Sequence, residues 1–225
     1  MEKSEFVEIA NSIAESGPDN ITDTYGKYAD KYDEFLKSYG VLDSEILTAY
    51  LKSIGVPSDA PISEFGCGTG RTGGFLNEGG FSNIEGLDGS EGMLAKARAK
   101  PGIYRELHRV FFGAGEFPDA LKGRFRVTVN VALFMSGHAP PSTISEMLDS
   151  LKGEEGDKLV FVIREDQFET QGYKQYLDDL IEQGRIKFIY QEKHARKTTF
   201  EGYEDSLFGQ HTSSLLLHYE HTGKH

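Results

Sequence analysis

Residues 61–70 read PISEFGCGTG, a short apolar stretch that ends in an acid and is followed by glycine at every second position. This pattern predicts a strand that runs into a tight turn, where the backbone approaches a ligand closely. Residues 71–76 predict the start of a helix, and residues 84–88, IEGLD, predict a second strand that ends in the carboxylate of Asp88. A βαβ unit of this kind holds a nucleoside at the carboxyl ends of its strands.

Two classes of nucleoside ligand are compatible with this turn. Gly68, Gly70 and Gly73 satisfy the G-x-G-x-x-G pattern of dinucleotide sites, and Asp88 stands where such a site places its ribose-binding acid. A pyrophosphate, however, needs helix N-terminal amides and little negative charge nearby, and Glu64 lies just before the first glycine. S-adenosylmethionine (SAM) carries a sulfonium and an ammonium and no phosphate, so Glu64 favours SAM over a nicotinamide dinucleotide.

The string from Glu64 to Gly70 resembles the first motif of the class I SAM-dependent methyltransferases, and Asp88 resembles their second motif, an acid at the end of the next strand. Residues 25–33, YGKYADKYD, are similar to a tyrosine-containing segment that covers the cofactor in many small-molecule methyltransferases. Residues 87–94, LDGSEGML, are similar to the family's adenine-framing segment. The resemblance implies SAM as cofactor, S-adenosyl-L-homocysteine as product and methyl transfer by SN2 displacement.

From residue 25 to residue 188 the order of the segments and their local sequences resemble those of the Williams-Beuren syndrome region methyltransferase-like proteins. That resemblance implies no particular substrate. It does imply a set of cofactor-binding residues, which are Tyr25, Tyr32, Glu64, Gly66, Gly68, Gly70, Asp88, Gly89, Met93, Ala114, Gly115 and Val131.

Two positions depart from the pattern of the family. The turn after its third strand usually carries an Asp that accepts a hydrogen bond from the adenine amino group. Ala114 stands there in this chain, so the backbone of Ala114 and Gly115 would have to read the adenine. Arg126 stands where an Asp commonly opens the fourth strand. We expect the change at Ala114 to lower cofactor affinity more than it affects function.

Apolar periodicity predicts an α/β chain of alternating strands and helices. Strands are expected at residues 62–65, 84–88, 107–112, 125–133, 159–163, 186–190 and 213–219. Helices are expected at residues 5–14, 25–33, 46–54, 71–76, 90–98, 142–151 and 173–181. These elements match a doubly wound seven-stranded Rossmann-like methyltransferase sheet of order 3-2-1-4-5-7-6 with an antiparallel last strand. We expect one domain over residues 1–225, with an N-terminal helical lid region at 1–57 and a core at 58–225.

Composition disfavours several classes of partner. The chain has 225 residues and a formal net charge of -12, which opposes nucleic acid because phosphate contacts need clustered Lys and Arg. No apolar run approaches the roughly 20 residues of a membrane helix, and the N-terminal residues lack signal-peptide features. Cys67 is the single cysteine, so no internal disulfide forms, and a reducing cytoplasmic location is expected. Its place in the turn predicts a small residue that fills space.

Methyl transfer needs an aligned nucleophile, and some acceptors need a base as well. His138, in the loop after the fourth strand, is the first candidate for that catalytic base, and a solvent-facing loop histidine is the alternative interpretation. Glu165 and Asp166, expected in the loop after the fifth strand, are further candidates. No metal site is predicted, because the remaining histidines considered are too scattered, at His194, His211, His218, His221 and His225.

Three functions remain open at the level of sequence. The first is a SAM-dependent methyltransferase, as a monomer or homodimer, that acts on a small molecule or, as the less favoured alternative, on a protein side chain. The Asn/Asp-Pro-Pro-Tyr signature of exocyclic amine methylation is absent, which disfavours DNA-type and glutamine-amide acceptors. The second is an NAD-dependent oxidoreductase, which lacks an evident Tyr-x-x-x-Lys pair. The third is a non-catalytic SAM-binding protein, which the departures at Ala114 and Arg126 allow.

Overall fold

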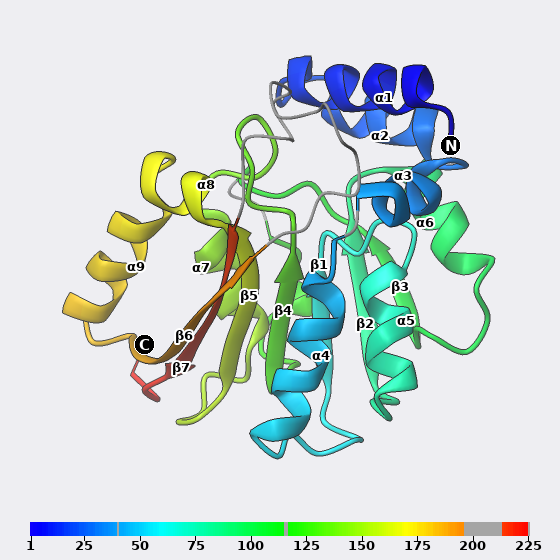
Figure 1. The fold of residues 1–225 in the computed structure, drawn as a ribbon. Helices are drawn as coiled ribbons and strands as arrows, with labels where there is room; N and C mark the ends of the chain where they lie inside the picture. The colour runs from blue at the N-terminus through cyan, green and yellow to red at the C-terminus, as the bar shows by residue number, and fades with distance from the viewer. Residues whose placement is uncertain (40, 115–116, 196–212, 225) are drawn as a thin grey trace.

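A computed structural model describes residues 1–39, 41–114, 117–195 and 213–224 of the chain. Its centre is one sheet of order β3-β2-β1-β4-β5-β7-β6 (Figure 1), which confirms the predicted fold class and strand order. Strands β1 to β5 run parallel, and β7 is antiparallel to both β5 and β6. The strands are β1 Ile62–Phe65, β2 Ile84–Asp88, β3 Glu106–Arg109, β4 Val127–Val131, β5 Lys158–Arg164, β6 Ile186–Ala195 and β7 Ser213–His221.

Helices cover both faces of this sheet. They are α1 Lys3–Glu15, α2 Ile21–Tyr28, α3 Tyr32–Tyr39, α4 Asp43–Ser53, α5 Arg71–Glu78, α6 Glu91–Arg98, α7 Thr143–Ser150, α8 Glu165–Thr170 and α9 Tyr173–Glu182, with a 3-10 turn at Asp119–Leu121. Leu47 of α4 and Leu76 of α5 pack in one apolar cluster with the sheet, and Met147 of α7 and Leu177 of α9 pack in another. Both faces of β5 are therefore buried, as its continuous apolar run predicts.

Helices α1 to α3 form a separate apolar cluster above the sheet (Figure 1), with Phe6, Ile9, Ile13 and Phe35 at its centre. We call these three helices the lid. Helix α4, which the sequence division grouped with the lid region, packs instead on the sheet through Leu47. Helices α1 to α3 thus pack with one another, whereas α4 packs with the sheet.

One helix was predicted across residues 25–33, and that prediction is wrong. The chain forms a turn at residues 29–31 between α2 and α3, where Lys31 N–H donates to Tyr28 O over 2.9 Å. Gly26 of α2 packs so closely on α6 that a Cβ at Gly92 would lie 2.7 Å from the Gly26 Cα. This tertiary contact fixes α2 on α6, and α3 then leaves in a new direction.

Several element boundaries also differ from the sequence prediction. β3 and β4 are shorter than expected, and β6 continues to Ala195 because its pairing with β7 extends that far. Glu165 and Asp166 were placed in a loop, but they form the first turn of α8. Arg164 donates to both carboxylate oxygens of Asp166, at 3.0 and 2.8 Å. The acid is thus held at the start of the helix, where the helix dipole favours it.

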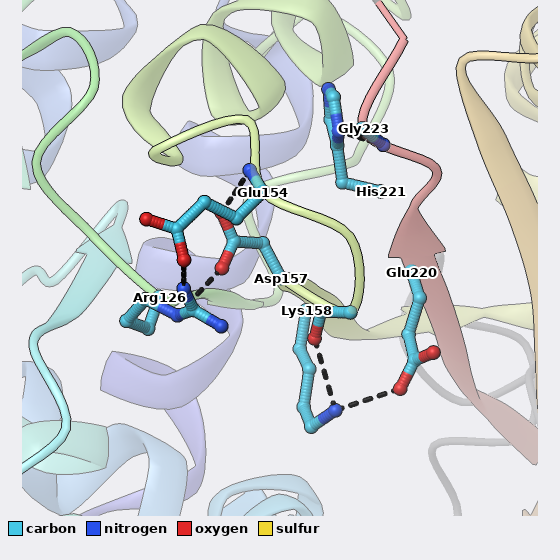
Figure 2. A network of polar contacts seen from close by, with 8 residues as sticks. Arg126, Glu154, Asp157, Lys158, Glu220, His221 and Gly223 are labelled. Carbon is cyan, nitrogen blue, oxygen red and sulfur yellow. Dashed lines mark hydrogen bonds and ion pairs between the residues drawn. The ribbon is translucent and has the colours of Figure 1, made fainter.

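Arg126 lies at the end of the sheet where β4 begins, opposite to the end where Asp88 closes β2. It lies just before β4 and forms ion pairs with Glu154 and Asp157, with 2.7 Å between its Nε and Asp157 Oδ1 (Figure 2). Nearby, Lys158 of β5 pairs with Glu220 of β7 at 2.7 Å. The departure at Arg126 therefore belongs to a charged network that joins strands, and it lies away from the glycine turn.

No helix within the described residues is both long enough and apolar enough to cross a membrane.

Gly73 and Gly74 are neighbours in α5 with different surroundings. A Cβ at Gly73 would lie 2.3 Å from the hydroxyl of Tyr104, whereas a Cβ at Gly74 would meet only Ile103, at 3.8 Å. Tyr104 cannot move aside freely, because its hydroxyl donates a 2.8 Å hydrogen bond to buried Glu64.

We expect Gly73→Ala to lower the free energy of unfolding by about 1–3 kcal/mol through overpacking. Gly74→Ala is the matched control and should raise it by about 0.5–1 kcal/mol, because alanine is the better helix former. Urea unfolding followed by circular dichroism measures both changes. Equal effects of the two substitutions would contradict the packing of Tyr104 against α5.

Candidate functional site

The glycine turn links β1 to α5. Gly66, Gly68 and Gly70 have φ angles of 71°, 54° and 84°, a region that residues with a Cβ adopt at a cost. The N–H groups of Gly66 and Cys67 both donate to Leu87 O, at 2.8 and 3.0 Å. The turn is therefore anchored on β2 and cannot shift without breaking the pairing of the two strands.

Asp88 is bound by the same turn. Its Oδ2 accepts from Gly68 N–H and its Oδ1 accepts from Ser90 N–H, both at 2.8 Å. Burial raises the pKa of Asp88 above its ordinary value, and the two backbone donors act against that rise. Each carboxylate oxygen keeps a further lone pair for a ligand hydroxyl.

Two cavities meet at this carboxylate. The first has a volume of about 520 Å³, within the usual range for a small-molecule site, and Gly89, Phe111, Ala114 and Pro140 contribute to its wall. The second, of about 90 Å³, lies against the glycine turn. Both are lined by Tyr25, Asp88, Leu133 and His138. The site is thus a divided cleft between the strand ends and the lid.

Tyr25 and His138 contact each other where the two cavities meet. The Tyr25 hydroxyl lies 2.8 Å from His138 Nε2, and the Tyr32 ring packs edge-on against Tyr25 with centroids 5.4 Å apart. Burial lowers the pKa of His138, partly offset by its hydrogen bond to Ser136 O. Burial also raises the pKa of Tyr25 well above its ordinary value, and it raises that of Tyr32 to about 12. At neutral pH the imidazole and both phenols are uncharged.

The structure brings most of the predicted site residues together. Gly89 and Ala114 line the first cavity, and Tyr25 and Asp88 line both. The second cavity is also lined by Tyr32, Gly66, Gly68, Met93 and Val131. Glu64 lies beneath the turn and Gly70 ends it, and neither lines a cavity. Gly115 lies outside the described residues. His138, predicted as a base, is half-buried between the cavities rather than facing solvent.

Glu64 supports the turn from below. It is 1% exposed and accepts the Tyr104 hydroxyl at 2.8 Å. Burial raises the pKa of Glu64 to about 8, although the hydrogen bond from Tyr104 acts in the opposite direction. Cys67 is buried as well, and burial raises its pKa well above the ordinary value. Its thiol therefore fills space and is a poor nucleophile.

Two features of the lining fit SAM. The hydroxyl of Ser90 is buried, lines the first cavity and has no hydrogen-bond partner among the described residues, so a ribose hydroxyl beside Asp88 would satisfy it. A Cβ at Gly68 would meet nothing within 4 Å, so the turn leaves open space on the wall of the second cavity. The first cavity thus offers polar partners for a ribose at Asp88 and Ser90, and the second leaves space beside the glycine turn.

The sequence analysis missed the link between the lid and the turn. Thr69 Oγ1 in the turn donates to Asp33 of α3, and Lys100 pairs with the same carboxylate. Arg71 donates to Val41 O over 3.1 Å and lines the second cavity. These partners are far apart in the chain, so no local pattern could have revealed them.

Comparisons with known proteins were made for both sequence and structure. No family model matches the chain. Methyltransferase-like protein 27 of Homo sapiens is 33% identical over 127 residues, which cover 55% of this chain. The match covers 50% of that relative, so the chain aligns with only about half of its length. This similarity supports a distant relationship to that Williams-Beuren region protein.

Solved structures match over more of the chain. A Haloferax volcanii protein in complex with the Trm112 methyltransferase activator has a TM-score of 0.66 at 16% identity, and the match covers 90% of this chain and 98% of that one. A TehB-like SAM-dependent methyltransferase from Corynebacterium glutamicum gives 0.59 at 16% identity, covering 88% and 98%. Magnesium protoporphyrin IX methyltransferase from Synechocystis, with bound SAM, gives 0.57 at 14% identity, covering 80% and 78%.

The chain has the class I methyltransferase fold.

This methyltransferase fold separates the chain from the dinucleotide-binding proteins that share its glycine pattern. Dinucleotide-binding Rossmann sheets are built from two mononucleotide-binding halves in the order 3-2-1-4-5-6. Here the antiparallel strand β7 lies between β5 and β6. The edge beyond β5 is thus a hairpin rather than part of a second nucleotide-binding half.

One group in the methyltransferase fold could offer metal ligands, namely Glu85, Glu106 and His108 on β2 and β3, within the part of the chain that the structure describes. Glu85 already pairs with His108 at 2.8 Å and with Arg124 at 2.5 Å. Neither of the two acids nor the histidine lines either cavity of the cleft. The group therefore has no part in the site.

The raised pKa of Glu64 makes stability depend on pH. The folded state keeps its proton up to pH about 8, whereas an unfolded glutamate releases it near pH 4.3. The folded state binds more protons between these values, so the free energy of unfolding falls as the pH rises through them.

We expect Glu64→Gln to remove this loss. The free energy of unfolding of the variant, measured relative to that of wild type, should rise by about 2–4 kcal/mol between pH about 5 and pH about 8. Urea unfolding at both pH values gives the difference. Glu78→Gln, at the exposed end of α5, is the control and should follow wild type. Parallel pH profiles for wild type and Glu64→Gln would show that Glu64 ionises normally.

Proposed function

We propose that this chain is a SAM-dependent methyltransferase that acts on a small-molecule acceptor. The observation that carries the proposal is the cleft at Asp88, in which an anchored glycine turn, a buried carboxylate and two joined cavities lie at the strand ends of a methyltransferase fold. The sequence similarity to a methyltransferase-like protein supports the same assignment.

SAM, when bound, supplies an electrophilic methyl group on a sulfonium. We assign the ribose hydroxyls to Asp88 and Ser90, and the adenine to the wall formed by Gly89, Phe111 and Ala114. The methionyl group would lie along the glycine turn, beneath Tyr32. The lid excludes water from the cleft and aligns the reacting groups, and alignment supplies much of the rate of a direct displacement.

A small acceptor fits the cleft better than a macromolecule. The lid covers the strand ends, and the first cavity is large enough for part of the cofactor and a compact second molecule. The net charge of -12 disfavours a nucleic acid. We propose that the protein works in the cytoplasm, in line with its single buried cysteine.

A non-catalytic SAM-binding protein is the second candidate function. Ala114 favours it, because this residue replaces the acid that reads adenine in the family pattern. The base candidate His138, held between the two cavities, favours catalysis instead. Methyl transfer from labelled SAM to small molecules of cell extracts distinguishes the two, since only the enzyme yields a labelled product.

Asp88→Ala should weaken SAM binding by about 1–3 kcal/mol, because ligand hydroxyls would lose a charged acceptor. This corresponds to a Kd about 5 to 150 times higher in titration calorimetry. Asp119→Ala removes an exposed acid that pairs with Lys122, and this variant should bind SAM as wild type does. Thermal unfolding must show that Asp88→Ala is folded, because Asp88 also holds the turn. Unchanged affinity of the folded variant, or tighter binding of NADH than of SAM by wild type, would refute the proposed site.

A further inference from the structure

The Tyr25–His138 contact defines which tautomer the imidazole adopts. His138 Nδ1 lies 3.0 Å from Ser136 O, and a carbonyl oxygen can only accept, so Nδ1 carries the proton. Nε2 is then the unprotonated nitrogen, and it accepts the Tyr25 hydroxyl at 2.8 Å. A proton from the cleft therefore reaches the basic nitrogen of His138 through the hydroxyl of Tyr25.

Tyr25 occupies the junction of the whole cleft. It lines the two main cavities and also a third, apolar cavity of about 40 Å³ that Phe35 and Phe134 help to line. Its hydroxyl therefore stands between the glycine turn, where the methionyl group fits, and the larger cavity, where an acceptor fits. A proton released at this junction meets the Tyr25–His138 pair first.

The first cavity is lined mostly by apolar residues, together with uncharged polar ones such as Thr22, Ser136 and Gln171. Away from Asp88, its wall includes Pro18, Ile21, Met135, Pro140 and Pro141. No Lys or Arg contributes to the described part of this wall. A carboxylate or phosphate on the acceptor would lose its hydration there without gaining a counter-charge, which is strongly unfavourable.

We propose that the acceptor is an uncharged, mostly apolar molecule that is methylated on a hydroxyl group, and that Tyr25 and His138 relay the hydroxyl proton. This inference rests on the proposed methyltransferase function. The chemistry of the pair selects the reacting group. An amine can attack before it loses a proton, and a thiol ionises readily near neutral pH, whereas a phenolic hydroxyl, with a pKa near 10, needs a base.

The step conserves atoms and charge. The acceptor oxygen forms a bond to the methyl carbon while its proton passes to the Tyr25 oxygen. The original Tyr25 proton passes to His138 Nε2, and the electron pair of the broken carbon–sulfur bond stays on sulfur. The positive charge thus moves from the sulfonium to the imidazolium, which then releases its proton to water.

The protonation states of the pair suit a relay. Burial lowers the pKa of His138, so the ring is neutral and able to accept at pH 7. Burial raises the pKa of Tyr25, so the phenol keeps its proton between turnovers. The other titratable or charged groups that line the three cavities are Tyr32, Cys67, Arg71, Asp88, Arg164 and Tyr173.

A ring-matched acceptor panel tests the substrate class. The panel consists of phenols of one to three fused rings, each with the carboxylic acid and the amine of the same ring system. Binding is measured by titrating each compound into protein saturated with S-adenosyl-L-homocysteine. Methyl transfer to each compound is measured separately with labelled SAM. We expect the phenols to bind at least 10 times more tightly than the acids and to be the preferred methyl acceptors. Product from no phenol, or faster product from acids or amines, would overturn the inference.

Variants test the relay itself. Tyr25→Phe and His138→Gln should each lower kcat for the best phenol about 100-fold or more, with the Kd of S-adenosyl-L-homocysteine within about threefold of wild type. In wild type, kcat/KM should fall as the pH drops through the His138 pKa, below about 6.5. The pH profile of His138→Gln should lack this fall in kcat/KM at acidic pH. A raised KM with unchanged kcat would show that the pair only holds the lid.

Two substitutions outside the cleft serve as matched controls. Tyr176→Phe removes a phenol that bonds Ser145 at 2.7 Å, and His108→Gln removes a histidine of β3. Both should keep the wild-type kcat and pH profile. Failure of SAM to bind wild type would refute the proposed function, whereas SAM binding with activity insensitive to Tyr25 and His138 would refute the relay alone.

Discussion

The hydrogen bonds that Asp88 accepts from Gly68 and Ser90 hold the site together. They join the end of β2 to the turn after β1 and to the start of α6, so three elements converge on one carboxylate. The two N–H groups that donate to Leu87 O reinforce the same junction. The two backbone donors fix the direction of this buried carboxylate and act against the rise in its pKa that burial causes.

The layer beneath the turn carries a second buried acid with a different protonation state. Glu64 meets a phenol and lies among apolar neighbours, so it is protonated at neutral pH, whereas Asp88 faces backbone donors. A neutral Glu64 avoids repulsion between two carboxylates that burial brings together. A neutral Glu64 does not repel a pyrophosphate, so the charge of this acid does not distinguish SAM from a dinucleotide as the sequence suggested. The distinction rests instead on the strand order, in which the antiparallel β7 lies between β5 and β6.

The lid links binding to chemistry. Asp33 of α3 contacts the turn through Thr69, and Tyr25 of α2 contacts His138 in the loop after β4. The three helices of the lid therefore contact both the glycine turn and the loop after β4. If the lid moved, the turn and the imidazole would lose partners together, so closure and assembly of the site are coupled.

The sequence by itself determined the βαβ unit, because glycine spacing, strand-end acids and apolar runs are local signals. The strand order and the residues of the cleft wall were predicted from the resemblance to class I methyltransferases, and the structure confirms the strand order. Tertiary structure alone decided how α2 lies against α6, where Gly26 packs closely on Gly92. It alone placed Arg126 at the far edge of the sheet and Tyr25 against His138. Those contacts join residues distant in the chain, and their energy depends on burial and direction, which no linear spacing encodes.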